Sequence, residues 1–151
     1  MSNKLPLDSL IELARSKNED ATRRLGQLQN NRTCAAEKLQ MLLQYRQDYV
    51  DQMQEKMLCG VESSYLRNFQ DFIVTLDGAI EQQRAVTLQA DSRLEHGRGD
   101  WKFSKRRLNS FETLASRVCK QEMMALGKAE QRDSDERTSR RFYLQSSKLA
   151  A

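Results

Sequence analysis

The sequence has few of the residues that reverse a polypeptide chain. Proline occurs once, at Pro6, and glycine occurs six times in 151 residues. Compact α/β enzymes depend on frequent turns, and glycine and proline supply much of the geometry that turns require. The scarcity of both residues argues against a multi-stranded sheet and a catalytic α/β sandwich. The abundance of Gln, Glu, Lys, Arg, Leu and Ala, which are strong helix formers, instead favours a few long helices.

Metal ligands and long apolar runs are also scarce. Cys34, Cys59 and Cys119 lie far apart and form no Cys-x-x-Cys pair, which favours reduced thiols over a disulfide framework or a zinc site. His96 is the only histidine, so no metal site is expected. There is no run of about 18 apolar residues, and residues 1–10 lack the apolar core of a signal peptide. We therefore expect a cytoplasmic protein without a transmembrane segment.

Apolar residues recur with the 3.5-residue spacing that is typical of a coiled coil. A first stripe covers residues 7–56, and a second covers residues 66–129. Polar residues interrupt the first stripe at regular intervals, at Asn18, Arg32 and Arg46. Polar residues in a seam can fix the register of the helices, but arginine stems also extend outward from a thin seam without any such role. The pattern leaves both interpretations open.

The two stripes are separated by a single plausible reversal at Gly60. Glycine readily adopts the left-handed conformation that ends many helices, and a short loop makes the flanking helices antiparallel neighbours. The sequence therefore predicts an all-α fold, a long antiparallel two-helix coiled-coil hairpin forming one domain over residues 1–151. The expected parts are a helix over 7–58, a turn over 59–63, a helix over 64–137 and a frayed tail over 138–151.

Gly97 and Gly99 lie inside the second stripe. Each glycine costs about 1 kcal/mol of helix stability relative to alanine, so we hypothesise a bend or local fraying there. The same two residues form a Gly-x-Gly pattern, but it follows no predicted strand and is not a nucleotide-binding fingerprint. No phosphate-binding loop and no catalytic constellation is present, so we expect no enzymatic activity and no cofactor.

A basic patch begins between these two glycines and consists of Arg98, Lys102, Lys105, Arg106 and Arg107. Such a patch is compatible with a solvated face or protein contact, with an anionic membrane surface, or with nucleic acid. Nucleic-acid binding favours more bases on one face with aromatic residues between them. Trp101 instead falls on the apolar stripe. We therefore favour the first interpretation and expect no nucleic-acid partner.

A second row of residues lies beside the seam on the predicted second helix and contains Phe72, Leu76, Ala79 and Gln83. This flank is more apolar than a two-helix seam needs, and exposed apolar rows often mark docking surfaces. In the alternative interpretation Phe72 simply folds over the tip of the hairpin.

The segment Met41–Tyr49 contains the pattern Leu-x-x-Tyr-x-x-x-Tyr, in which Leu42, Tyr45 and Tyr49 hold the specified positions. This pattern resembles the FliJ family, small soluble components of the bacterial flagellar type III export apparatus. The segment Asn68–Ile80, and Trp101 with the bases after it, are also similar to that family.

The resemblance implies a fold similar to the central stalk of rotary ATPases, and three kinds of partner. These are the ring of the flagellar export ATPase, the linker of the membrane-embedded export gate, and empty export chaperones. The family's gate-contacting row would fall on Phe72, Leu76 and Ala79, with Gln83 in place of a histidine. Glutamine cannot carry a proton charge, so a protonation role is not expected at that position.

The resemblance also implies a location on the cytoplasmic side of the cell membrane, with peripheral association at the flagellar base. For the ATPase contact we expect the first turns of the first helix and residues 115–141. The main alternative function is a structural coiled-coil adaptor or scaffold without an export role, and a basic nucleic-acid binder is a third.

Overall fold

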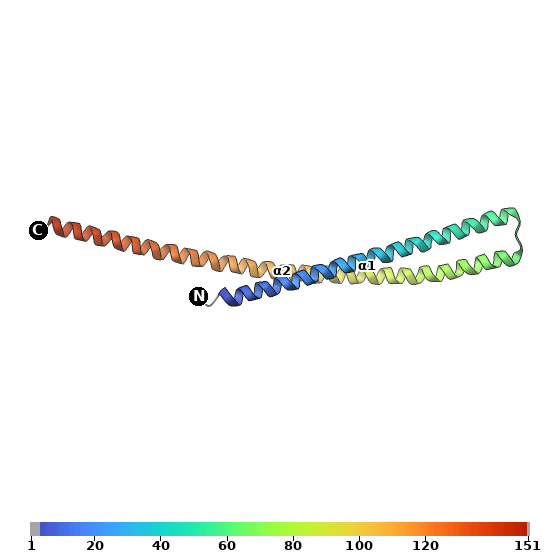
Figure 1. The fold of residues 1–151 in the computed structure, drawn as a ribbon, viewed down its shortest axis with the longest axis horizontal. Helices are drawn as coiled ribbons and strands as arrows, with labels where there is room; N and C mark the ends of the chain where they lie inside the picture. The colour runs from blue at the N-terminus through green and yellow to red at the C-terminus, as the bar shows by residue number, and fades with distance from the viewer. Residues whose placement is uncertain (1–3, 151) are drawn as a thin grey trace. The chain divides into compact units, whose positions relative to one another are not determined.

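The computed structural model describes residues 4–150 and contains two helices, α1 (Lys4–Cys59) and α2 (Ser63–Leu149), as Figure 1 shows. The helices contain 56 and 87 residues. Between residues 4 and 150 there is no β-strand. The predicted all-α fold of two long helices that pack together is confirmed.

Contacts within the chain divide it into two units, which are described separately below. The hairpin unit spans Ser16–Lys105 and contains most of α1, the reversal and the first part of α2. The terminal unit combines the described residues up to Arg15 with those from Arg106 onward.

The reversal in the hairpin unit is formed by residues 60–62. Gly60 has φ of 78°, the left-handed conformation expected of a glycine after a helix end. The Glu62 carbonyl accepts hydrogen bonds from the backbone N–H groups of Tyr65 at 3.1 Å and Leu66 at 3.3 Å. These bonds start α2 at Ser63, one residue before the start predicted at residue 64.

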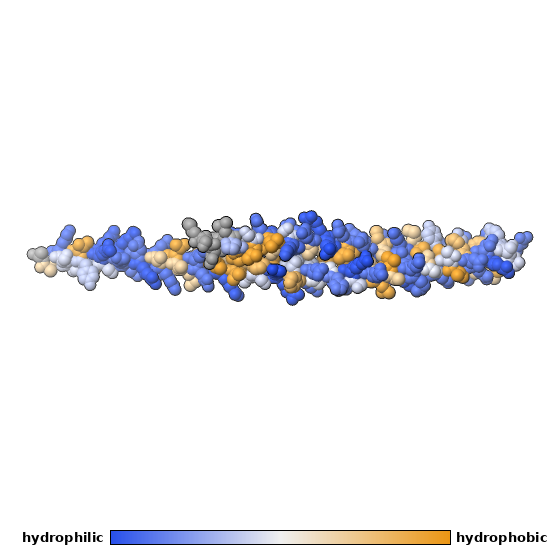
Figure 2. All heavy atoms as spheres, turned by 90° about the horizontal axis from the view of Figure 1, so that it is seen from below, coloured by the Kyte–Doolittle hydropathy of each residue, from blue (hydrophilic) through white to orange (hydrophobic). Residues whose placement is uncertain are grey.

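The core of the hairpin unit is a thin seam between α1 and α2. Its buried side chains are those of Ala35, Leu76, Ile80 and Leu94, and all four belong to the predicted stripes. Most other stripe positions in this unit are half-buried. Two helices cover only one face of each other, so hydrophilic residues dominate the outer surface, and hydrophobic residues form separate clusters in Figure 2.

The polar interruptions of the seam connect the two helices at one register. Arg32 Nε donates to Asp91 Oδ1 at 2.7 Å, and Arg46 Nε donates to Asp77 Oδ1 at 2.5 Å. The Ser104 hydroxyl donates to Asn18 Oδ1 at 3.2 Å. Each step along α1 from one of these residues to the next is matched by an equal or nearly equal step backward along α2. Both arginines remain about half exposed, so their value lies more in pairing the helices correctly than in stability.

Gly97 is a close-packing position, and α2 remains helical through Gly97 and Gly99. A Cβ atom added to Gly97 would lie 2.5 Å from Leu28 Cδ1, whereas one added to Gly99 would meet nothing within 4 Å. The helix is continuous at this pair, so fraying is not seen there, while a bend stays a hypothesis. Gly97 in addition has a packing role that was not predicted. The propensity cost of glycine in a helix says nothing about the residue that packs against it.

The terminal unit has a short seam of its own. Ala14 of α1 and Leu108 of α2 are buried, and Phe111, Ala115 and Val118 of α2 are half-buried. Arg15 Nη2 lies 3.7 Å from Glu112 Oε1 across the two helices.

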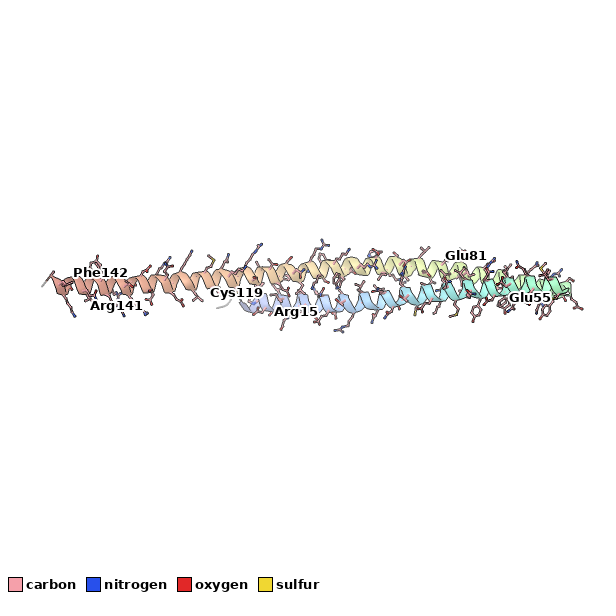
Figure 3. All side chains as sticks on the ribbon, turned by 90° about the horizontal axis from the view of Figure 1, so that it is seen from above. Arg15, Glu55, Glu81, Cys119, Arg141 and Phe142 are labelled. Carbon is pink, nitrogen blue, oxygen red and sulfur yellow. The ribbon has the colours of Figure 1, made fainter. Side chains whose placement is uncertain are left out.

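Beyond Val118, every described residue of α2 is exposed. Figure 3 labels Arg141 and Phe142 on this stretch, where the side chains extend from a single helix. The helix nonetheless continues to Leu149, so the region predicted to fray is helical up to that residue. Arg137 pairs with Asp133 and Arg140 pairs with Glu136, both at 2.6 Å and four residues apart. Such pairs stabilise a helix without any apolar stripe, and a search for apolar periodicity overlooks them. Ala151 lies outside the described residues.

Candidate docking face near the hairpin tip

The predicted row on α2 is divided between the seam and the surface. Leu76 is buried with 9% exposure, while Phe72 is 42% exposed. Ala79 is half-buried. The Gln83 side-chain amide donates to the Ala35 carbonyl at 3.0 Å. Phe72 is therefore the member of the row that presents a large apolar surface to solvent, while Leu76 and Gln83 hold the helices together.

Aromatic residues from both helices surround Phe72. The Tyr49 ring on α1 lies 4.5 Å from the Phe72 ring and 5.9 Å from the Phe69 ring, measured between centroids. Tyr65 lies 5.5 Å from Phe69. Tilted ring pairs at these distances are attractive. Phe72 thus packs against Tyr49 of the other helix while 42% of its surface stays exposed.

Lys56 closes this cluster toward the hairpin tip. Its ammonium lies 4.4 Å from the centre of the Tyr65 ring and 5.0 Å from that of Phe69, and it donates to the Tyr65 hydroxyl at 3.2 Å. A cation over aromatic faces is stabilising. The Lys56 ammonium therefore holds one end of the cluster in place, and the exposed part of Phe72 forms the other end.

Residues of α1 belong to the same part of the hairpin unit and were not proposed as site residues. Tyr49 contacts Phe72 directly. Tyr45 and Met41 of α1 are 52% and 56% exposed. All three lie in the segment Met41–Tyr49, whose tyrosine spacing carried the family resemblance. Placing this segment beside Phe72 would have required the register of the two helices as well as the motif.

The basic patch is exposed, but part of it is engaged within the chain. Arg98 forms an ion pair with Glu95 at 2.5 Å. Lys102 and Lys105 complete the portion of the patch in the hairpin unit. In the terminal unit, the Arg107 guanidinium lies 5.9 Å from the centre of the Phe111 ring, and Arg106 is exposed. These partners support the interpretation as a solvated face.

Ligand-forming side chains are dispersed along the helices. Among the described residues no group of three or more His, Cys, Asp and Glu side chains could hold a metal ion. Cys34, Cys59 and Cys119 are free and exposed. No described helix is long and apolar enough to cross a membrane.

The chain is similar to known flagellar proteins over most of its length. The profile of the family described as flagellar FliJ protein matches residues 3–147. The flagellar FliJ proteins of Salmonella typhi and of Escherichia coli (strain K12) are each 32% identical over 130 residues, which cover 86% of this chain and 88% of the relative. The match includes all of α1, α2 up to residue 147, and the segment that carries Tyr49 and Phe72. A two-helix chain with a family match over nearly its whole length belongs to the FliJ family of flagellar proteins.

Proposed function

We propose that this FliJ family member is a non-enzymatic component of the bacterial flagellar protein export apparatus. It binds the ring of the export ATPase and the linker of the membrane export gate, promotes assembly of the ATPase, and escorts empty export chaperones. It acts from the cytoplasm, peripherally associated with the membrane at the flagellar base. Family membership supports the export role, and the resemblance described above supplies the individual partners.

The observation that carries the gate contact is the half-open aromatic cluster around Phe72. Phe72 is 42% exposed and rests on Tyr49. An exposed aromatic residue held in place by neighbours loses little conformational freedom on binding, which makes it a good anchor for a partner. Ala79 lies on the same flank and is half-buried, so a partner that covers Phe72 has a shallow apolar surface beside it.

The ATPase contact is proposed for the terminal unit, including residues 115–141. Beyond Val118 this part of α2 has every described side chain exposed. A helix that extends past its partner has backbone hydrogen bonds satisfied internally and one face free for another protein. The chain would then transmit contacts mechanically, and hydrolysis of ATP would belong to the ATPase alone.

Phe72→Ala is the sharpest test of the gate contact. Truncating Phe72 removes the exposed ring, and we expect binding to the purified gate linker to weaken about thirtyfold, because a buried aromatic anchor contributes about 2 kcal/mol to an interface. The measurement is titration calorimetry with a matched pull-down of the export ATPase, which should bind the variant normally.

Val74→Ala is the matched control, because Val74 is two residues away on α2 and 68% exposed. Leu76→Ala is a poor probe of this contact, since Leu76 is buried in the seam and its loss would weaken the hairpin itself. Unchanged affinity of Phe72→Ala for the gate linker would refute the gate assignment. A wild-type chain that binds neither the linker nor the ATPase would instead favour the scaffold without an export role.

A further inference from the structure

The part of α2 beyond Val118 is a helix that has no buried or half-buried face among its described residues. Residues 119–150 are all exposed. Most helix stability in proteins comes from packing one face against another element, and this stretch lacks such packing. It also exposes large apolar side chains, those of Met123, Met124, Leu126, Phe142, Tyr143, Leu144 and Leu149. The order of charged and apolar residues along this stretch indicates which kind of partner would cover it.

The exposed stretch has four consecutive blocks of different chemistry. An apolar block at 123–126 is followed by an acidic block at 130–136. The acidic block contains four acids and Arg132, for a net charge of −3. The basic block at 137–141 contains Arg137, Arg140 and Arg141 and no acid, for a net charge of +3. A second apolar block follows at 142–149, interrupted by polar residues.

This order is complementary to its own reverse. Read backward, the two charged blocks are basic and then acidic, so an antiparallel copy places the base-rich block against the acid-rich block. A parallel copy would place like charges together. We propose that residues 119–149 of two copies of this chain pair antiparallel to form a two-fold symmetric dimer. Symmetric dimers use one self-complementary surface in this way.

Asp133, Glu136 and Arg140 lie on the helix face that α2 already uses in the terminal unit, and Arg137 lies beside that face. Successive steps of three or four residues from Val118 reach Ala129, Asp133, Glu136 and Arg140, which continues the half-buried stripe of the terminal unit. If Asp133 of one copy lies opposite Arg140 of the other, the same register places Glu136 opposite Arg137 and Ala129 opposite Leu144. The seam would thus be charged at its centre, with the apolar pairs Ala129–Leu144 and Met124–Leu149 on either side of the charges.

A second copy fits this stretch better than an acidic or a basic partner does. The charges of the two central blocks cancel within the stretch, so neither block leaves an excess for a partner of one charge sign. Within one chain, Asp133 pairs with Arg137 and Glu136 pairs with Arg140, which keeps the four side chains ordered on the helix surface. The inference stands on these blocks alone and is independent of the proposed export role. It implies that a chain paired in this way cannot present the same face to the ATPase ring.

The test is sedimentation equilibrium of the full chain over a dilution series. We expect a mass that doubles with increasing concentration at low salt, and a shift toward monomer at about 1 M salt, where the Debye length falls to about 3 Å. A wild-type chain that stays monomeric at the highest concentration of the series overturns the proposal.

Two charge-reversed variants identify the surface. The acid-rich variant carries Arg137→Glu and Arg140→Glu, and the base-rich variant carries Asp133→Arg and Glu136→Arg. Each alone should remain monomeric at concentrations about tenfold above the wild-type dissociation constant, because like charges then meet across the seam. An equimolar mixture of the two should form a heterodimer, since each segment becomes the complement of the other.

The mixture shows whether a variant fails to dimerise because its interface is lost or because its helix is weakened. Reversal places like charges four residues apart within each chain, which weakens the helix slightly, but mixing does not repair that defect. Lys38→Glu combined with Arg67→Glu, exposed bases of the hairpin unit, is the control and should dimerise as the wild type does. If the acid-rich and base-rich variants dimerise alone, or if their mixture does not, the pairing of residues 119–149 is refuted.

Discussion

The two stretches of α2 on either side of Val118 have similar backbones and opposite surroundings. Up to Val118, one stripe of α2 side chains is buried or half-buried against α1, and its acids Asp77 and Asp91 reach bases on α1. After Val118 every described residue is exposed, and the ion pairs Arg137–Asp133 and Arg140–Glu136 lie within the helix. Secondary structure alone therefore does not reveal which part of this helix is stabilised by packing. Matched substitutions in the two stretches measure how much packing contributes to the free energy of unfolding in each.

The largest contrast is expected between Leu94→Ala and Leu126→Ala. Leu94 is 5% exposed in the seam and Leu126 is 64% exposed. Truncating a buried leucine removes transfer free energy and leaves a cavity, at a cost of about 2–5 kcal/mol. We expect a value near 2 kcal/mol for Leu94, because neighbours in a thin seam can move inward, and a change within about 0.5 kcal/mol for Leu126.

Urea unfolding followed by Trp101 fluorescence measures this contrast. Trp101 is the only tryptophan, and its indole N–H donates to Thr22 Oγ1 across the seam at 3.0 Å, so its emission reports on the hairpin unit. Measurements in dilute solution keep self-association from adding to the apparent stability. Equal losses at the two positions would mean that the stretch after Val118 is packed as tightly as the seam.

A second contrast uses the glycines Gly97 and Gly127. A Cβ at Gly97 would approach Leu28 Cδ1 to 2.5 Å, whereas one at Gly127 would meet nothing within 4 Å. Gly97→Val adds bulk to a filled position and should cost about 1–3 kcal/mol. Gly127→Val should be neutral or slightly stabilising, because valine is a better helix former than glycine. The midpoint of urea unfolding distinguishes the two, with Gly97→Ala as the smaller step. A Gly97→Val variant as stable as the wild type would show that Leu28 turns away without loss.

The regular spacing of apolar residues was sufficient to predict the two helices, the reversal at Gly60 and the buried stripe. Apolar spacing predicts the buried positions here because each helix packs against one other helix, so its buried positions repeat at the coiled-coil interval. The packing role of Gly97 was missed because helix propensity is a local quantity, while this role depends on Leu28, far away along the chain. Helix beyond residue 137 was overlooked because its stabilising pairs are polar.

The candidate docking row was only partly interpretable from the sequence. Spacing placed Phe72, Leu76, Ala79 and Gln83 on one flank of α2, but it could not show how the seam divides them. The burial of Leu76 and the hydrogen bond from Gln83 to the Ala35 carbonyl depend on the register between the helices. Cross-helix contacts such as Arg32–Asp91 and Arg46–Asp77 occur at one alignment of the helices, whereas the apolar stripe repeats along them.

The smallest contrast compares ion pairs across the seam with ion pairs along one helix. Arg46 bonds Asp77 between α1 and α2, with side chains 40% and 49% exposed, and Arg137 bonds Asp133 within α2. Exposed pairs contribute about 0–1 kcal/mol, and helix pairs four residues apart contribute about 0.2–0.5 kcal/mol. A double-mutant cycle with Arg46→Ala and Asp77→Ala should give a coupling near the upper end of that first range. The same cycle on Arg137 and Asp133 should give a coupling too small to move the Trp101 transition, because that pair joins no second helix.

A coupling near zero for Arg46 and Asp77 would mean that Gly97 and the apolar residues set the register of the two helices. In that case the regular polar interruptions of α1 would be snorkelling side chains after all.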